Sequence, residues 1–366
     1  ETKCIGSIEE LKSEIAKAVA AGVSRPIEVT DLHKPVVDEI TLVSASGKPM
    51  KRVPDLIDVW FDSGAMPFAQ WHWPFENEAK VGSFNSQGVF EAGSFFPADF
   101  IAEGVDQTRG WFFTLHVLAC AITDGKYPAY KNVVSNGLLL DKNGNKMSKR
   151  LGNVIDPFET LEKYSADATR WYMMRNSDPW DNMKFDIAGL QEVQRSLFGT
   201  LYNTYAFFAL YANIDKPQKP NSKLENNPNF VELDKWILSR LQTLVKETTA
   251  YYEDFEPTKA ARAIEKFVDE DLSNWYVRLN RRRFWKGEMS SDKQAAYDVL
   301  YHCLVTVAKL MSPISPFVSE WLFQNLNGSG SIHLELLEPA NEDFINQDLE
   351  QRTELAQKSC SLILSL

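Results

Sequence analysis

The residue types best suited to chemistry gather in a short basic segment, residues 146–150 (KMSKR). Lys146 and Lys149 are three residues apart, and Gly144 and Gly152 stand on either side of them. Because a lysine ammonium group is a compact point charge, two of them on a flexible loop can close on a polyanion such as a triphosphate. The spacing alone leaves a solvated basic turn as the alternative.

A second group of polar side chains follows residues 98–104 (ADFIAEG), which are predicted to form a short buried strand. Glu103, Asp106 and Gln107 lie where this strand turns into a helix predicted over residues 107–123. Taken in isolation, acidic residues at such a position are ordinary helix caps, and Asp106 is the predicted N-cap.

A third group combines basic and aromatic residues in one predicted helix, residues 257–286. Its basic members are Arg278, Arg281, Arg282, Arg283 and Lys286, and its aromatic members are Trp275, Tyr276, Phe284 and Trp285. Arginines bind phosphates and aromatic rings stack on bases, so the segment favours contact with RNA. The other interpretation is a helix with a basic solvent face and an aromatic core face. We expect both to apply: the aromatic residues mainly to a core, and part of the arginines to nucleic acid.

The elements that must position the first two groups indicate an α/β fold. The strand at 98–104, the helix after it and a second predicted strand at 132–140 form the pattern of a parallel sheet, in which ligands gather at the carboxyl ends of the strands. Segments 103–107 and 136–149 both fall at those ends. Residues 55–76 are rich in aromatic residues and broken by glycine and proline, and are expected to be irregular.

From residue 155 onward the pattern becomes helical. Apolar spacing predicts helices over residues 155–175, 188–212, 230–254, 257–286, 292–311 and 316–327, and from about 346 to the end, with a loop at 214–229. One isolated strand is expected at 331–337 (SIHLELL). Before the α/β part, a helix is predicted over 8–21 with Ser7 as its N-cap.

Composition limits the class of protein. The 366 residues are 44% hydrophobic, which is ample for sizeable cores, and the net charge of -11 does not suggest a generic nucleic-acid coat protein. The four cysteines are scattered and no cysteine–histidine pair has zinc-finger spacing, so we expect a cytoplasmic protein without a zinc site. No apolar run reaches about 18 residues, so no membrane span is expected. Asp31, His33 and Asp38 are interpreted as polar surface rather than a metal site.

Several motifs together resemble the isoleucyl-tRNA synthetases, which are class I aminoacyl-tRNA synthetases. DVWFDSG (58–64), EGVDQTRGWFF (103–113) and NGLLLDKNGNKMSKRLGN (136–153) occur in the order and spacing of that family. The last contains KMSKR, which is similar to the KMSKS signature of class I. Residues 273–285 and 312–323 resemble the family's anticodon-binding domain. The resemblance implies the C-terminal half of a Rossmann-type catalytic domain followed by an all-α anticodon-binding helical bundle.

The resemblance also implies domain boundaries and partners. The expected parts are the end of an inserted connective region (1–54), the catalytic half (55–154), a connecting helical segment (155–187), the anticodon-binding bundle (188–330) and the start of a further region (331–366). ATP with Mg²⁺ is the implied cofactor, isoleucine and tRNA(Ile) are the implied partners, and a monomer is expected.

Individual roles follow from the same resemblance. Lys146 and Lys149 are the expected catalytic residues, with Lys149 more important in the transition state. The expected ATP contacts are Gly104, Asp106, Gln107, Asn136, Gly137, Lys146, Met147, Ser148 and Lys149. Isoleucine or its adenylate is expected to contact Glu103, which holds the ammonium group, and the pocket walls Trp60 and Trp111. The expected tRNA contacts are Arg278, Arg281, Arg282, Arg283 and Lys286.

One signature of the family is absent from the sequence. None of the five histidines forms the H-x-G-H tetrad, which in the family helps to hold the phosphates from the opposite side. Both ends of the chain also look cut. We therefore expect an internal piece of a longer protein, which alone makes no aminoacyl-adenylate. A valyl-tRNA synthetase and a non-catalytic tRNA-binding module derived from a synthetase stay open as alternatives, and a generic nucleotide-binding α/β protein fits least.

Overall fold

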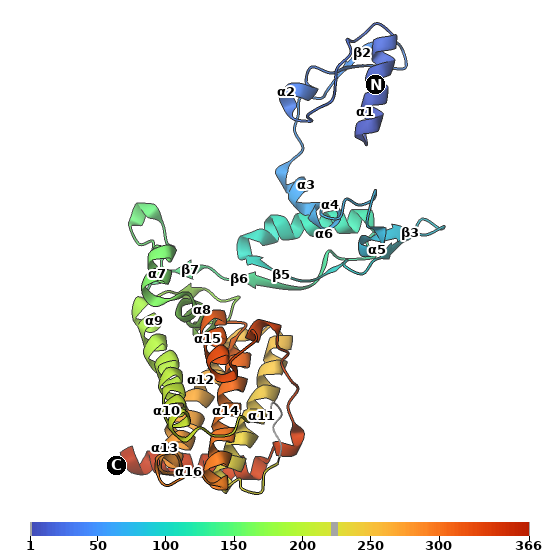
Figure 1. Ribbon diagram of the computed structural model, residues 1–366. Helices are drawn as coiled ribbons and strands as arrows, with labels where there is room; N and C mark the ends of the chain where they lie inside the picture. Colours follow the sequence, from blue (N-terminus) through green and yellow to red (C-terminus); the bar gives the residue numbers. More distant parts are fainter. Residues whose placement is uncertain (1, 221–225, 366) are drawn as a thin grey trace.

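The chain is arranged as three bodies in succession, a small N-terminal unit, an α/β part and a larger helical body (Figure 1). The computed structural model describes residues 2–220 and 226–365. Part of the predicted loop at 214–229, residues 221–225, lies outside the described residues, as does the last residue of the predicted terminal helix. The order of α/β and helical parts is the one that the sequence predicts.

The N-terminal unit packs one helix against a short hairpin. It consists of α1 (Ile8–Ala20), α2 (Lys34–Val37), β1 (Thr41–Val43) and β2 (Pro49–Lys51). The predicted helix is confirmed, and the Ser7 side chain accepts a hydrogen bond from the Glu10 amide, which satisfies one of the free N–H groups at the helix start.

The α/β part has a compact aromatic core beside a pair of parallel strands. Its elements are α3 (Val59–Gly64), α4 (Met66–Ala69), α5 (Glu78–Val81), β3 (Gly82–Phe84), β4 (Phe90–Ala92), β5 (Ala98–Gly104), the 3-10 helix η1 (Val105–Arg109), α6 (Trp111–Ile122) and β6 (Tyr130–Asn136). The expectation of an irregular segment at 55–76 is therefore wrong, since α3 and α4 lie there. Asp58 caps α3 by accepting a hydrogen bond from the Trp60 amide, a local signal that the aromatic richness of the segment obscured.

Strands β5 and β6 are parallel, as predicted, and α6 connects them. The core beneath them gathers Phe68, Phe90, Phe96, Phe112 and Leu115. The prediction that residues 98–104 are buried is wrong for most of the strand, because Ile101 is buried while Phe100 is 42% exposed. Parallel strands are normally covered on both faces, and among the described residues this sheet has only two strands.

The second predicted strand, 132–140, is divided in two. Its first part is β6, and its last residues form β7 (Leu139–Leu140), which leaves that sheet and pairs in parallel with β8 (Met183–Lys184). The break falls at Gly137, where a side chain would meet the Asp181 carbonyl oxygen at 2.1 Å, so only glycine fits beside this backbone. The three leucines 138–140 are consequently not the end of a buried strand, since Leu138 and Leu139 are both exposed.

The helical body confirms the predicted helices. Its elements are α7 (Pro157–Tyr164), α8 (Ala166–Asn176), α9 (Ile187–Val193), α10 (Gly199–Asp215), α11 (Glu232–Glu253), α12 (Pro257–Lys266), α13 (Arg278–Trp285), α14 (Ser291–Met311), α15 (Pro316–Asn327) and α16 (Gln347–Ser365), with π-helical segments at Gln194–Phe198 and Phe267–Val277. Ser165 has a φ of 73° and separates α7 from α8. The predicted strand at 331–337 is wrong: Ile332–Leu334 is a 3-10 helix, because Glu320 accepts the Ile332 amide hydrogen and buries that residue against the bundle.

Candidate functional site

The register of β5 and β6 brings two of the sequence motifs together. Gly104 pairs with Asn136 and Glu103 pairs with Ser135, so both strands end side by side. Glu103 is exposed at this edge, and Asn136 is half-buried. The prediction that segments 103–107 and 136–149 begin at a common sheet edge is confirmed for the strand ends.

The turn after β5 is organised by an amide side chain. Gln107 Oε1 accepts a hydrogen bond from the Trp111 amide at 3.0 Å, and Gln107 Nε2 donates to Asp106 Oδ2 at 3.0 Å. Gln107 therefore caps the start of α6, whereas Asp106 was the predicted N-cap. The Asp106 carboxylate also lies where a side chain on Gly104 would be, at 2.6 Å, so a residue larger than glycine would displace it. This fixes an exposed carboxylate at the mouth of the strand–helix turn.

The two tryptophans of the motifs come from neighbouring helices, α3 and α6. Trp111 Nε1 donates to the Ser63 carbonyl oxygen at 3.0 Å, which ties the start of α6 to α3. Trp60 is 44% exposed, and its ring lies 3.3 Å from the position that a side chain on Gly110 would take. Trp60 and Trp111 thus form an apolar wall next to the Asp106–Gln107 turn.

The KMSKR segment is an exposed loop with ordered ends. Lys146 and Lys149 are exposed, while Met147 is partly buried and packs against the helical core. The Ser148 hydroxyl accepts the Leu151 amide hydrogen and begins the 3-10 helix η2 (Lys149–Leu151). Gly152 ends that helix with a φ of 63°, a backbone conformation that favours glycine.

Asp141 organises the start of the same loop. Its carboxylate accepts hydrogen bonds from the amides of Asn143 and Asn145 and from the side chain of Asn153. The hydrogen bond from Asn153, followed by those from Asn145 and Asn143, lowers the pKa of Asp141 to about 2 because these bonds stabilise the charged form. The role of Asn153 was not predicted from the sequence, although aspartate and asparagine beside glycine are typical of side chains that bond the backbone of turns.

The lysine loop and the tryptophan wall pack against different hydrophobic cores. In Figure 1 the segment between β7 and α7 projects from the helical body, while α3 and α6 lie together in the α/β part. The β7–β8 pair and the contact of Met147 with the helical core hold the loop in its place. The structure therefore brings together Trp60, Gly104, Asp106, Gln107 and Trp111, and it leaves Lys146 and Lys149 on the facing body.

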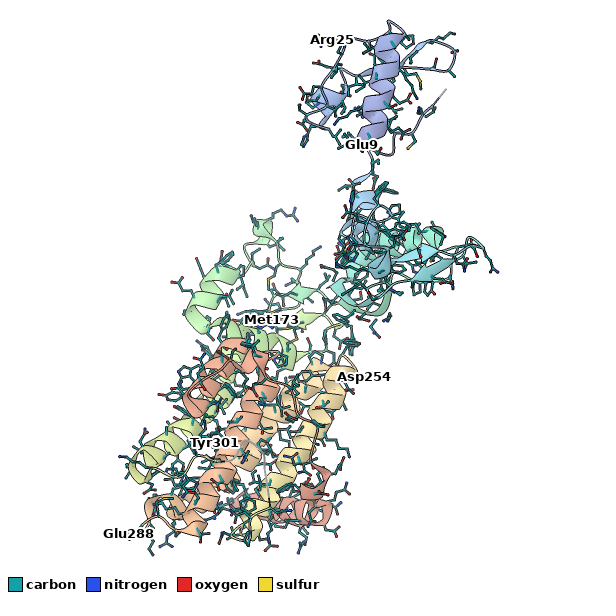
Figure 2. All side chains as sticks on the ribbon, turned by 45° about the vertical axis from the view of Figure 1, so that its right-hand side comes forward. Glu9, Arg25, Met173, Asp254, Glu288 and Tyr301 are labelled. Atoms are coloured by element: carbon teal, nitrogen blue, oxygen red, sulfur yellow. The ribbon has the colours of Figure 1, made fainter. Side chains whose placement is uncertain are left out.

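The basic helix lies at the far end of the bundle. Figure 2 labels Glu288, just beyond α13, at the end opposite to Met173 and Asp254, which face the α/β part. Four of the predicted tRNA contacts are exposed there, namely Arg278, Arg281, Arg282 and Lys286, and Trp285 beside them is 55% exposed. Tyr276 and Phe284 are fully buried, so the division into a basic outer face and an aromatic inner face is confirmed for these residues.

Arg283 differs from its basic neighbours. Its guanidinium is 15% exposed and forms ion pairs with Asp234, which is fully buried, and with Asp292, each at 2.8 Å. Tyr276 also donates its hydroxyl to Asp234 at 2.7 Å. Arg283 was predicted to contact tRNA, but its donors are committed to these internal carboxylates.

Neither a metal cluster nor a membrane helix occurs in the described part of the chain. Within residues 2–220 and 226–365, no three histidine, cysteine or carboxylate side chains gather as ligands. His33 bonds Asp31, and Asp38 pairs with Arg52. None of the described helices is long and apolar enough to cross a membrane.

Two family models match the chain, one on each side of the junction between its parts. The model described as "tRNA synthetases class I (I, L, M and V)" matches residues 5–186, and that described as "Anticodon-binding domain of tRNA ligase" matches residues 234–366. The chain belongs to the class I tRNA synthetases. It carries α/β catalytic-domain structure followed by a helical anticodon-binding domain, as the fold class predicted from the sequence.

Two curated relatives of this synthetase chain are both named isoleucine–tRNA ligase. An isoleucine–tRNA ligase of Cytophaga hutchinsonii is 58% identical over 372 residues, which cover 100% of this chain and 32% of the relative. That of Thermus thermophilus is 47% identical over 88% of this chain and 29% of its own length. The chain thus spans about a third of the relatives that it matches.

A solved structure has the same fold. It is a LeuRS from Agrobacterium radiobacter in a ternary complex with tRNA and LeuAMS, which matches with a TM-score of 0.64 at 21% identity, over 84% of this chain and 36% of that one. At this identity the likeness concerns the fold alone.

Proposed function

We propose that the complete gene product containing this synthetase chain is an isoleucine–tRNA ligase, which activates isoleucine with ATP and transfers it to tRNA(Ile). The observation that carries the proposal is the β5–β6 register, which joins Gly104 and Asn136 beside the Asp106–Gln107 turn and the Trp60–Trp111 wall. The names of the relatives support isoleucine as the amino acid.

In the activation step the isoleucine carboxylate attacks the α-phosphate of ATP, a new P–O bond forms, and pyrophosphate leaves with the electrons of the broken bond. The protein must align the two reactants. Glu103, exposed at the strand end, would hold the isoleucine ammonium group, and the tryptophan wall would face its side chain. Asp106, Gln107 and Gly104 would receive the ribose.

The lysine loop would act on the other end of ATP. Lys146 and Lys149 are exposed and would stabilise the charge on departing pyrophosphate, with the Ser148 hydroxyl proton free to reach a phosphate oxygen. Met147 would serve as the anchor of the loop, since it packs on the helical core. Asn136 and Gly137 would border the adenine. ATP would arrive with Mg²⁺, which takes much of its coordination from phosphate oxygens and water and so asks few ligands of the protein.

The tRNA would bind the far end of the bundle. Arg278, Arg281, Arg282 and Lys286 present positive charge there, and the exposed Trp285 ring offers a stacking surface. Arg283 is left out of this surface because its guanidinium is held by Asp234 and Asp292.

The remaining predictions complete the proposal. The part boundaries are those expected from the sequence, at 1–54, 55–154, 155–187, 188–330 and 331–366. We propose that the protein is a monomer in the cytoplasm, and that the 366-residue chain alone does not form the adenylate, because it contains no H-x-G-H tetrad.

Exchange of labelled pyrophosphate into ATP tests the proposal. The complete gene product should catalyse this exchange in the presence of isoleucine. With valine the exchange should be at least about 100-fold less efficient. Lys149→Ala should lower the exchange rate about 10²–10³-fold, because it removes one charged donor from the leaving pyrophosphate. Lys142→Ala, at another exposed lysine four residues before the loop lysine Lys146, is the matched control and should leave the rate unchanged. Preference for valine, or full activity of the Lys149 variant, would contradict the proposal.

A further inference from the structure

The two ends of the KMSKR loop are tied together by one pair of short polar side chains. Asn153, after the loop, donates from Nδ2 to Asp141 Oδ2 at 2.9 Å and to the Lys146 carbonyl oxygen at 3.3 Å. Its Oδ1 accepts the Ser148 amide hydrogen at 2.9 Å. Asn153 therefore bonds a residue before the loop (Asp141), the first loop lysine (Lys146) and the residue Ser148 between the two lysines.

Asp141 forms the other half of the tie. Its Oδ1 accepts the Asn143 and Asn145 amide hydrogens at 2.9 and 2.8 Å, and its own amide donates to the Asn145 carbonyl oxygen at 2.9 Å. The residue is only 9% exposed, and in the described contacts its carboxylate receives amide donors from Asn143, Asn145 and Asn153. A carboxylate that accepts hydrogen bonds from several amide groups restrains the backbone, and it does not neutralise the charge of a neighbouring lysine.

We propose that Asp141 and Asn153 are positioning residues, which fix the path of the KMSKR backbone and thereby where Lys146 and Lys149 stand. The inference rests on the proposed function for its catalytic consequence, but the tie itself is a property of the loop. The described hydrogen bonds of both side chains are made within the loop itself. The two residues act through the Ser148 amide and the Lys146 carbonyl, which belong to the backbone that carries both lysines.

Loss of the tie should have two separate effects. The loop ends would part, and the peptide bonds after Lys146, Lys149 and Arg150 would fit more readily into the trypsin active site. The lysines would also spend less time in the orientation that stabilises pyrophosphate, so kcat of exchange would fall while KM for isoleucine, whose proposed contacts lie on the α/β part, would not change.

A side-chain exchange provides the decisive test. Asn153→Asp replaces the hydrogen bond between the two side chains with two facing carboxylates. Because these repel each other, this variant should open the loop most. In the double variant Asp141→Asn/Asn153→Asp the donor and the acceptor have changed places, so the hydrogen bond between the two side chains can form again, and the Ser148 and Asn145 amides still find acceptors. The two longer bonds are lost, namely that from Asn153 to the Lys146 carbonyl oxygen at 3.3 Å and that from Asn145 Nδ2 to Asp141 Oδ2 at 3.4 Å. The double variant should therefore recover most of what the single variant loses.

Both readouts use the complete gene product. Trypsin cleavage at the loop, located by mass spectrometry, should become about 10-fold faster in Asn153→Asp. In the double variant the cleavage rate should return to within about 3-fold of the parent. The kcat of exchange should fall in Asn153→Asp and recover in the double variant. Asn85→Ala is the matched control, since Asn85 Oδ1 likewise accepts two amide hydrogens, from Gln87 and Val89, in a distant hairpin.

Two results would overturn the inference. One is a double variant that is cleaved as fast as Asn153→Asp, and the other is a single variant whose cleavage and kcat equal those of the parent. Thermal melting followed by circular dichroism identifies a variant that is unfolded altogether, and Asn153→Ser then supplies a milder loss of the same contacts. If the parent shows no exchange with any amino acid, the proposed function fails, whereas the cleavage rates still decide whether the tie exists.

Discussion

The two hydrophobic cores of the chain differ in how completely they are covered. In the helical body, Trp171, Trp236 and Tyr276 are fully enclosed by helices of up to 22 residues. In the α/β part the core is smaller, and Phe100 and Val133 on the two parallel strands remain 42% and 47% exposed. The helical core is thus closed by the chain's own elements, while the sheet presents apolar surface to its surroundings.

This difference matters because the candidate site is divided between the two cores. The residues proposed to bind isoleucine and the ribose stand on the α/β part, around the Asp106–Gln107 turn. The lysines stand on a loop whose strand β7 pairs with β8 beside the helical body. Since the proposed site uses both, the contacts between the cores set its geometry as much as the residues themselves do.

The largest effect is expected where the closed core contains charge. Asp234→Ala removes the buried partner of Arg283 and of the Tyr276 hydroxyl, and should lower the free energy of unfolding of the helical body by about 3–5 kcal/mol. Urea unfolding followed by circular dichroism measures it. Asp99→Ala, which breaks an exposed pair with Lys131, is the control and should cost less than about 1 kcal/mol.

Equal costs for the Asp234 and Asp99 variants would contradict the closed helical core. They would mean that the carboxylate at the start of α11 is hydrated in solution in spite of its burial in the structure. A large cost for Asp234→Ala alone would locate the main stability of the chain in the helical body.

An intermediate effect is expected at the junction between the cores. Gly137→Ala would place a methyl group 2.1 Å from the Asp181 carbonyl oxygen, so β7 must move away from its partner. We expect a loss of about 1–3 kcal/mol in local stability from this overpacking. Hydrogen exchange should report it, as faster exchange of the Met183 and Phe185 amides, which donate to Leu138 and Leu140.

The matched control for the junction is Gly199→Ala in α10. There the nearest atom would be at 3.4 Å, and alanine should be neutral or stabilise the helix by up to about 1 kcal/mol. Unchanged exchange at Met183 in the Gly137 variant would contradict the close approach of Gly137 to the Asp181 carbonyl oxygen.

The sequence was sufficient for the elements whose signals are local. The Ser7 cap and the long helices of the bundle follow from side-chain chemistry and apolar spacing, and the parallel strands follow from their connection through a helix. The strand expected at 331–337 did not form because none of the described strands pairs with it, and a distant residue, Glu320, bonds its backbone instead.

The candidate site shows the same division. The motifs indicated Glu103, Asp106 and the lysines as candidates, since residue type and order suggest their chemistry. The sequence did not reveal that Gln107 caps α6, or that Asn153 returns to Asp141. Nor did it separate Arg283 from its exposed neighbours, because a buried partner such as Asp234 lies 49 positions away in the chain. Tertiary contacts decide these roles, and spacing along the chain does not encode them.

The smallest effect is expected at a direct contact between the cores. Phe100 on β5 stacks on Phe255, at the end of α11, with ring centroids 4.7 Å apart and an interplanar angle of 16°. Because the α/β part leaves Phe100 partly exposed, the stack supplies cover that its own core lacks. A double-mutant cycle with Phe100→Ala and Phe255→Ala should give a coupling energy of about 1 kcal/mol in urea unfolding.

A cycle between Phe100→Ala and Phe158→Ala is the control for that coupling. Phe158 is 80% exposed on α7, and its coupling with Phe100 should stay within about 0.5 kcal/mol of zero. If the Phe100–Phe255 cycle also gives zero, the two cores unfold independently, and their relative position depends on the connection through Gly137. If it gives the expected coupling, the open core is stabilised by the closed one, and the stack helps to hold the halves of the site in register.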